Sequence, residues 1–259
     1  GVLVTNTSVA RLFTFKAASS NLITATLQLA AGTNPLPSVT YTILPGVAKS
    51  FTNAGFIAVP ATVIVPSAGP AAPYPSVITV SNLVGRVNKV TVQLSQLVHS
   101  YPDDIDILLV GPGGQRLVLL SDAGGSSAVL TNSPVTLTFD DAATAAVSDT
   151  GQMVSGTYYP TNYGAADTFE APAPAGPYAA TNLSVFNGAD PNGAWQLFVR
   201  DDASGDIGAI FTGWSLSIAT VAMTNPLVNL SVAVTAAPDP VFVTDLLSYT
   251  VALTNAGPN

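Results

Sequence analysis

The segment FNGADPNGAWQLFVRDDASGDIGAIFTGWSLSI, residues 186–218, contains the pattern that predicts the fold. Two runs in it alternate apolar with polar side chains, and their apolar positions are Trp195, Leu197 and Val199, then Trp214, Leu216 and Ile218. Alternation with a period of two buries one face of a β-strand and leaves the other face to water. The turn sequence DPNG at 190–193 precedes the first run, as expected where short turns join strands.

The same alternation occurs earlier in the chain, at Val90, Val92 and Leu94 and at Val135, Leu137 and Phe139. Signals for α-helices are few, because 21 Gly and 20 Pro are spread along the chain and Glu170 is its only glutamate. We therefore predict an all-β fold built as a sandwich of antiparallel sheets.

The composition excludes several classes of protein. Only 8% of the 259 residues are charged, and seven cations against fifteen acids give a net charge of -8. Binding to nucleic acid requires a basic surface, so we expect no nucleic-acid partner. No apolar run approaches the length of about 18 residues that a spanning helix needs, so we expect no membrane insertion. The chain also lacks Cys, which excludes disulfides, thiolate metal sites and cysteine nucleophiles.

The location expected from this composition is extracellular. Lys and Glu are scarce while Thr, Ser, Gly and Pro are abundant, and the opening residues GVLVTNTSV lead directly into a strand-like run. A mature secreted protein has these properties. We expect a protein of the bacterial cell surface.

The acidic residues divide the chain into parts. Residues 1–102 contain none, and all but two of the fifteen lie within 103–206. Proline-rich sequence near residue 70 is typical of a linker. We predict an N-terminal β segment (1–65), a linker (66–73), a central sandwich (74–220) and a C-terminal strand pair (226–259).

Three runs in the central part resemble a known family. They are HSYPDDIDILLVGPGG (99–114), TLTFDDAA (136–143) and the segment 186–218 quoted above. Together they resemble the P domain, or P/Homo B domain, which follows the catalytic domain in kexin-like and many bacterial subtilisin-like proteases. The matching features include His99 before an alternation of Asp with apolar residues, the GPGG turn, and Gly193 before Trp195. The resemblance implies a jelly-roll-like sandwich with an accessory, non-catalytic role.

Aspartates dominate the chemistry of this central part. Three Asp-Asp pairs stand where apolar runs begin or end, and Asp104 and Asp106 share one face of a strand. Ca²⁺ takes about 6–8 oxygen ligands, which carboxylates and loop carbonyls supply. We predict a structural calcium site with the ligands Asp104, Asp106, Asp140, Asp141, Asp201 and Asp202, and with Asp190 and Asp206 as second choices. The alternative is that these are solvated turn carboxylates, because Asp favours turns by itself.

Catalysis is not expected. His99 is the only histidine and no Gly-x-Ser-x-Gly sequence occurs, so neither a serine triad nor a histidine-rich zinc site can be assembled. Paired carboxylates hydrolyse glycosides when aromatic platforms hold the sugar, and Tyr158, Tyr159 and Tyr163 are candidates for such a platform. Tyrosines in a β loop are more often packing residues. We predict that the chain is not an enzyme and that His99 is structural.

The tail NPLVNLSVAVTAAPDPVFVTDLLSYTVALTNAGPN (225–259) resembles a second family. Its turn at 238–241, the following Thr244-Asp245 and the final TNAGP are similar to the opening of the Ig-like repeat of large bacterial surface proteins. The glycine usual before the second strand is missing, with Thr244-Asp245 in its place. The N-terminal part contains similar runs, SVTYTI (38–43) and FTNAG (51–55), so we expect Ig-like β segments on both sides of the sandwich.

Two strands cannot bury an apolar face alone, whereas an Ig-like sandwich has about seven. The tail residues that need partners are Val232, Val234, Phe242, Leu247, Tyr249, Val251 and Leu253. One explanation is that neighbouring repeats of a longer protein cover them. The other is that the tail of one molecule adds strands to the N-terminal sheet of the next, which builds a filament if the contact does not close.

Three functions follow, in order of preference. The first is a calcium-stabilised structural or adhesive surface protein that self-assembles head to tail. The second is the accessory P domain of a secreted subtilisin-like protease. The third is a carbohydrate-binding module that uses the tyrosine cluster.

Overall fold

The computed structural model describes residues 23–28, 30–31, 34–35, 39–46, 48–61, 68–164, 167–223, 230–237 and 248–255. The chain divides into two compact units. The larger unit is Pro45–Ala222, and the smaller unit combines Gly1–Leu44 with Met223–Asn259.

The larger unit contains strands and two short 3₁₀ helices, η1 and η2. Their bounds are β5 (Lys49–Asn53), β6 (Ile57–Val59), β7 (Gly69–Pro70), β8 (Ser76–Val80), β9 (Arg86–His99), η1 (Pro102–Asp104), β10 (Ile105–Val110), β11 (Arg116–Ser121), β12 (Val135–Phe139), β13 (Gly156–Tyr158), β14 (Thr161–Asn162), η2 (Leu183–Phe186), β15 (Gly193–Asp201), β16 (Gly208–Ile210) and β17 (Trp214–Met223).

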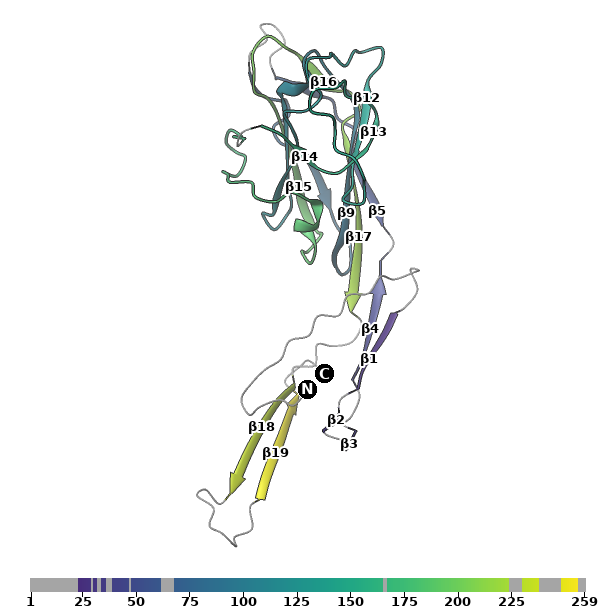
Figure 1. Ribbon diagram of the computed structural model, residues 1–259, viewed down its shortest axis with the longest axis vertical. Coiled ribbons are helices and arrows are strands. Elements are labelled where there is room, and N and C mark those ends of the chain that lie inside the picture. The colour runs from purple at the N-terminus through teal and green to yellow at the C-terminus, as the bar shows by residue number, and fades with distance from the viewer. Residues whose placement is uncertain are drawn as a thin grey trace. The chain divides into compact units, whose positions relative to one another are not determined.

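These strands form a two-sheet sandwich (Figure 1). One sheet has the order β17-β9-β12-β13, with β5 paired to β17, β16 to β9, and β6 to β16. The other has the order β14-β11-β10-β15, and β7 and β8 both pair with β15. The predicted all-β sandwich is confirmed, but the pairings β11–β14 and β12–β13 are parallel rather than antiparallel.

The apolar positions of all four predicted alternating runs are buried in the core between the sheets. Trp195 and Trp214 are fully buried, and each indole N–H has a partner. Trp195 Nε1 donates to the Pro191 carbonyl at 2.9 Å, and Trp214 Nε1 donates to Ser76 Oγ at 3.0 Å. Because buried N–H groups need acceptors, these bonds fix the turn before β15 and the position of β8.

Strand β10 departs from the alternating pattern because both of its faces are covered. All six of its residues are buried. One face contributes to the core between the sheets, while Leu108 and Val110 belong to a second apolar cluster on the outer side. Phe169 and Tyr178, from the segment that follows β14, pack in this second cluster. Asp106 lies on the same outer face of the strand and is 2% exposed.

The sandwich begins earlier than the sequence predicted. Strand β5 pairs with β17 over Lys49–Asn53, and β6 pairs with β16 over Ile57–Val59. Strand β7 lies in the predicted linker and pairs with β15. Residues from about 45 onward therefore belong to the sandwich, and the run FTNAG (51–55) is part of it rather than of an Ig-like segment.

The smaller unit contains three antiparallel strand pairs in its described part. They are β1 (Ile23–Leu27) with β4 (Val39–Pro45), β2 (Ala30–Ala31) with β3 (Asn34–Pro35), and β18 (Leu230–Ala237) with β19 (Ser248–Asn255). The register of β18–β19 places Val232 opposite Leu253 and Val234 opposite Val251. Tyr249 also lies on β19, whereas Phe242 and Leu247 lie outside the described residues.

Helices contribute little to the described part of the chain, and none found there has the length and hydropathy needed to cross a bilayer.

Candidate metal centre

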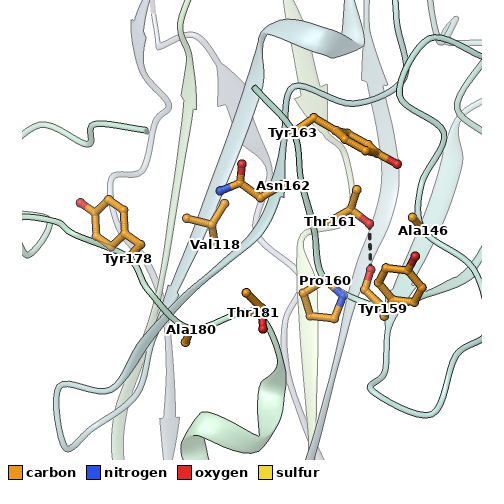
Figure 2. Close-up of a pocket in the computed structure, with 10 residues that line it drawn as sticks. All are labelled: Val118, Ala146, Tyr159, Pro160, Thr161, Asn162, Tyr163, Tyr178, Ala180 and Thr181. Atoms are coloured by element: carbon orange, nitrogen blue, oxygen red, sulfur yellow. Dashed lines mark hydrogen bonds between the residues drawn. The ribbon is translucent and has the colours of Figure 1, made fainter. Parts of the chain in front are cut away.

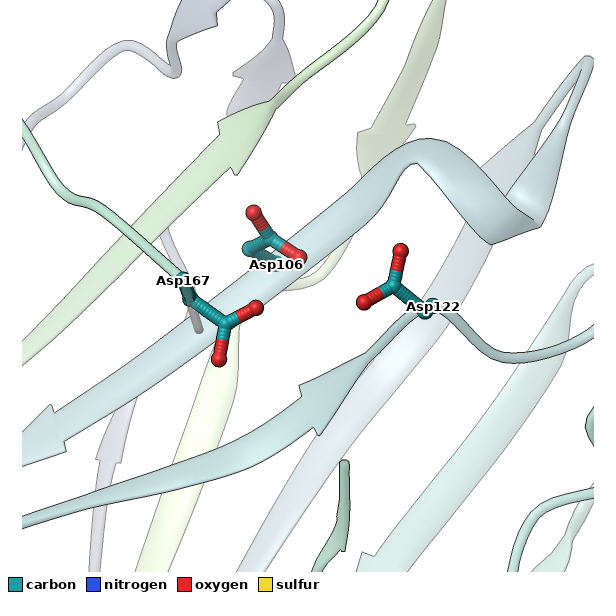
Figure 3. A group of neighbouring side chains, drawn as sticks. All are labelled: Asp106, Asp122 and Asp167. Atoms are coloured by element: carbon teal, nitrogen blue, oxygen red, sulfur yellow. The ribbon is translucent and has the colours of Figure 1, made fainter. Parts of the chain in front are cut away.

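Three carboxylates from separate parts of the larger unit converge on one point (Figure 3). Asp106 lies on β10, Asp122 follows β11, and Asp167 lies on the segment after β14. One oxygen of each lies within 4.8 Å of the others. The pairing of Ile107 with Leu120 brings β10 and the end of β11 together and so places Asp106 beside Asp122.

The hydroxyl of Ser121 lies at the centre of this group. Its Oγ is 2.8 Å from Asp106 Oδ1, 3.0 Å from Asp122 Oδ2 and 2.7 Å from Asp167 Oδ1. A serine hydroxyl carries one proton, so it can donate to only one of these oxygens. The other contacts join oxygen acceptors to each other, and such contacts require a further proton or a cation.

The electrostatics of the group also indicate that it needs a further proton or a cation. Burial raises the pKa of Asp106 to about 7, against a hydrogen bond from Ser121 that lowers it. Burial also raises the pKa of Asp122, and the nearby Asp167 adds to this. Raised carboxyl pKa values mean that the folded chain favours protons here, and a bound divalent cation provides the same compensation without them.

The close approach of Asp122 depends on a glycine. Gly164 has a φ of 71°, in the left-handed region, and a Cβ at this position would lie 2.7 Å from Asp122 Oδ2. Asn162, two residues earlier, donates from Nδ2 to Asp167 Oδ2 at 2.7 Å. The segment that carries Asp167 is therefore held against the end of β11 by both steric fit and hydrogen bonding.

The donor set is suitable for a hard cation. Three carboxylates and one hydroxyl supply oxygen ligands only, and Ca²⁺ takes about 6–8 oxygens at about 2.3–2.6 Å. Loop carbonyls or water would complete such a shell. Of the predicted ligands, the structure brings only Asp106 into this group.

Three of the other predicted residues serve the fold through hydrogen bonds. Asp140 pairs with Lys89 at 2.7 Å. Asp141 accepts bonds from the backbone N–H groups of Leu183 and Ser184, at 2.7 and 2.8 Å, at the start of η2. Asp190 accepts from the N–H of Asn192 at 3.0 Å. Of these contacts, only that of Asp190 is the local turn contact expected in the alternative prediction, whereas Asp140 and Asp141 bond to residues distant in the sequence.

The remaining predicted ligands form a separate acidic group, in which Asp201, Asp202 and Asp206 are close enough to Asp104 to act on its charge. Asp104 is buried, and burial together with the neighbouring Asp201 and Asp206 raises its pKa to about 7. Among the described residues, Asp106, Asp122 and Asp167 form the only group of three such side chains whose ligand atoms all lie within 4.8 Å.

His99 is enclosed by the sandwich. Its Nε2 lies 3.3 Å from Asp201 Oδ2, and both side chains are 0% exposed. Its Nδ1 lies 2.8 Å from the Tyr101 carbonyl.

Asp122 and Asp167 were missed because the first-choice ligands were the Asp-Asp pairs and Asp106, which shares a strand face with Asp104, and these two residues belong to neither pattern. A usable signal was present: Asp122 directly follows a strand, β11, that neighbours Asp106. No such signal exists for Asp167, because only the folded course of the segment after β14 brings it near.

Comparison with protein-family models and with curated protein sequences finds no match to this chain.

Proposed function

We propose that this chain is a non-catalytic extracellular structural or adhesive protein whose sandwich is stabilised by Ca²⁺. The observation that carries the proposal is the convergence of Asp106, Asp122 and Asp167 on the Ser121 hydroxyl. These groups join β10, β11 and the segment over the outer face of their sheet. An ion at this point would fasten elements that no disulfide holds, since the chain lacks Cys.

Calcium is the cation that this site favours. The donors are all oxygens, whereas zinc and copper prefer nitrogen and sulfur ligands, so the site is less suited to those metals. Mg²⁺ demands near-ideal octahedral geometry and keeps several waters, whereas Ca²⁺ accepts irregular carboxylate sites. Extracellular fluid supplies Ca²⁺ in quantity, which is consistent with the proposed location.

The proposal includes membership of the P-domain family for the sandwich. Motif residues that are distant in the sequence meet in space, which supports this assignment. Gly193 has a φ of 125°, and a Cβ there would lie 2.7 Å from Pro112 Cβ in the GPGG turn. His99 in turn faces Asp201, which belongs to the last motif run. These contacts give the motif residues structural roles, in keeping with an accessory domain.

The proposal also includes assembly through the C-terminal hairpin. Within the described residues, β18 and β19 pair only with each other. Their outer edges therefore present backbone N–H and C=O groups that another strand can pair with. Addition of this hairpin to the next molecule would be a head-to-tail contact, which extends into a filament when it does not close.

The calcium part is tested by thermal unfolding of the full chain in CaCl₂ and in EDTA. Calcium at about a hundred times its Kd is expected to add about 2.7 kcal/mol, or several °C of Tm. Asp167→Asn removes one ligand charge and should abolish most of that shift. Asp149→Asn, an exposed carboxylate outside the group, is the matched control and should keep it. Equal Tm values for the wild type in both buffers would contradict the calcium site.

A further inference from the structure

Beside the acidic group lies an open cavity of about 500 Å³ (Figure 2). Tyr159 and Tyr163 lie on one side of it, around Ala146, and Tyr178 lies on the other side beyond Val118. Among the described residues, no charged side chain lines this cavity. Its size is within the range of about 300–1,000 Å³ that is typical of small-molecule sites.

Two of the three tyrosine rings are fixed by their own hydroxyl groups. Tyr163 donates to the Val147 carbonyl at 3.0 Å, and Tyr178 donates to the Pro174 carbonyl at 2.8 Å. The Arg116 guanidinium also lies 6.0 Å from the centroid of the Tyr178 ring. Because these rings are already ordered, a ligand that contacts them costs little side-chain entropy.

Three polar groups at the cavity remain available for a ligand. The Tyr159 hydroxyl and the Thr181 hydroxyl make no hydrogen bond to the described part of the chain, and Tyr159 is 42% exposed. Asn162 uses its amide nitrogen to bond Asp167, which fixes the orientation of the side chain, and its carbonyl oxygen has no hydrogen-bond partner in the described part of the chain. The cavity thus combines ring surfaces with two hydroxyls and one amide oxygen.

We propose that this cavity binds a neutral saccharide. A sugar ring has an apolar C–H face that packs on an aromatic ring and hydroxyls that bond amide and hydroxyl groups. The uncharged lining gives no pairing for an ionised ligand, and the adjacent Asp167 disfavours an anionic one. The sequence prediction of a tyrosine platform is thereby changed: Tyr158 bonds the Val154 carbonyl instead, and Tyr178 takes its place.

The test is NMR titration of the ¹⁵N-labelled full chain, in CaCl₂, with neutral hexasaccharides of glucose, mannose and N-acetylglucosamine. Hexagalacturonate is the charged probe. At least one neutral probe should saturate and shift the Tyr159, Asn162 and Thr181 amides. Tyr159→Ala and the cavity-filling Thr181→Trp should each weaken binding more than about tenfold. Both positions are exposed, and Tyr101→Ala, an exposed tyrosine away from the cavity, should bind as the wild type does.

Three results would overturn the inference. One is that no neutral probe approaches saturation at about 10 mM, where the binding free energy would be weaker than about 3 kcal/mol. The second is that both cavity variants bind like the wild type. The third is that hexagalacturonate binds more tightly than every neutral probe. The calcium proposal is judged separately by its own Tm shift, because no carboxylate lines the cavity.

Discussion

We expect single buried carboxylates to contribute to the pH dependence of the stability of this protein. Asp104 is 9% exposed, and its pKa is raised to about 7 by burial and by Asp201, Asp206 and Asp202. In the unfolded chain an aspartate has a pKa of about 3.9. Between these values the folded chain binds the proton that the unfolded chain releases. Its contribution to stability is therefore fully present below about pH 3.9 and is lost as the pH rises toward 7.

This loss of stability with rising pH gives a prediction for Asp104→Asn, which introduces a neutral side chain of the same shape. In EDTA, the free energy of unfolding of the wild type should contain a loss between pH 4 and pH 7, of the order of 1 kcal/mol or more, that the variant lacks. Urea unfolding at several pH values measures the difference between the two slopes. Asp149→Asn, which changes an exposed carboxylate, should keep the slope of the wild type. Identical slopes for wild type and Asp104→Asn would show that the buried charge is compensated otherwise.

Elements in the sandwich are held by capping as well as by packing. Helix η2 is one turn long, and Asp141 accepts the N–H groups of Leu183 and Ser184 at its start. Its last residue, Phe186, packs on Trp195 with ring centroids 5.0 Å apart. The cap therefore positions an aromatic side chain of the core.

Asp141→Ala should destabilise the sandwich by about 1 kcal/mol, because two backbone N–H donors at the start of η2, one of them part-buried, lose a charged acceptor. The loss should be the same in EDTA and in CaCl₂, since Asp141 is remote from the acidic group. Asp149→Ala provides the control for loss of a surface charge. A loss that disappears in EDTA would instead make Asp141 a calcium ligand, as first predicted from the sequence.

The strands with one face toward the core and the other toward water could be predicted from the alternation of apolar and polar residues in the sequence. Val90, Leu137 and Leu216 all lie where the alternation placed them. Strand β10 was less predictable, because a distant segment covers its outer face and buries Asp106 as well. For the same reason the site was predicted in part: the sequence indicates Asp106, but Asp167 reaches it only through the folded course of that segment.

At the scale of the whole chain, a central sandwich lies between strand pairs that come earlier and later in the sequence, and its extent differs from the predicted one. The proline-rich stretch suggested a boundary near residue 74, yet β5 and β6 pair with β17 and β16. Charge distribution marks where the carboxylates are concentrated, whereas strand pairing decides which residues fold together. That is why the sandwich extends to about residue 45.

Self-assembly is predicted at this scale. If the edges of β18–β19 accept further strands, as proposed above, light scattering of the full chain should show mass that grows with concentration. Val251→Asp and Leu253→Asp on β19 should reduce the assembly to monomers. Val84→Asp, at a side chain 78% exposed in the sandwich, controls for the added charge. A monomeric wild type at every concentration would rule out the filament.

The segment that carries Asp167 also carries Phe169, which covers Leu108, Val110 and Phe198 on the outer side of a sheet. An ion bound between Asp167 and Asp106 would hold this segment against the sheet. Without calcium, the segment would be held less firmly, and the apolar surface of Leu108, Val110 and Phe198 would become accessible to neighbouring molecules. At the proposed site, Ca²⁺ would thereby also control whether this apolar surface is available to other molecules.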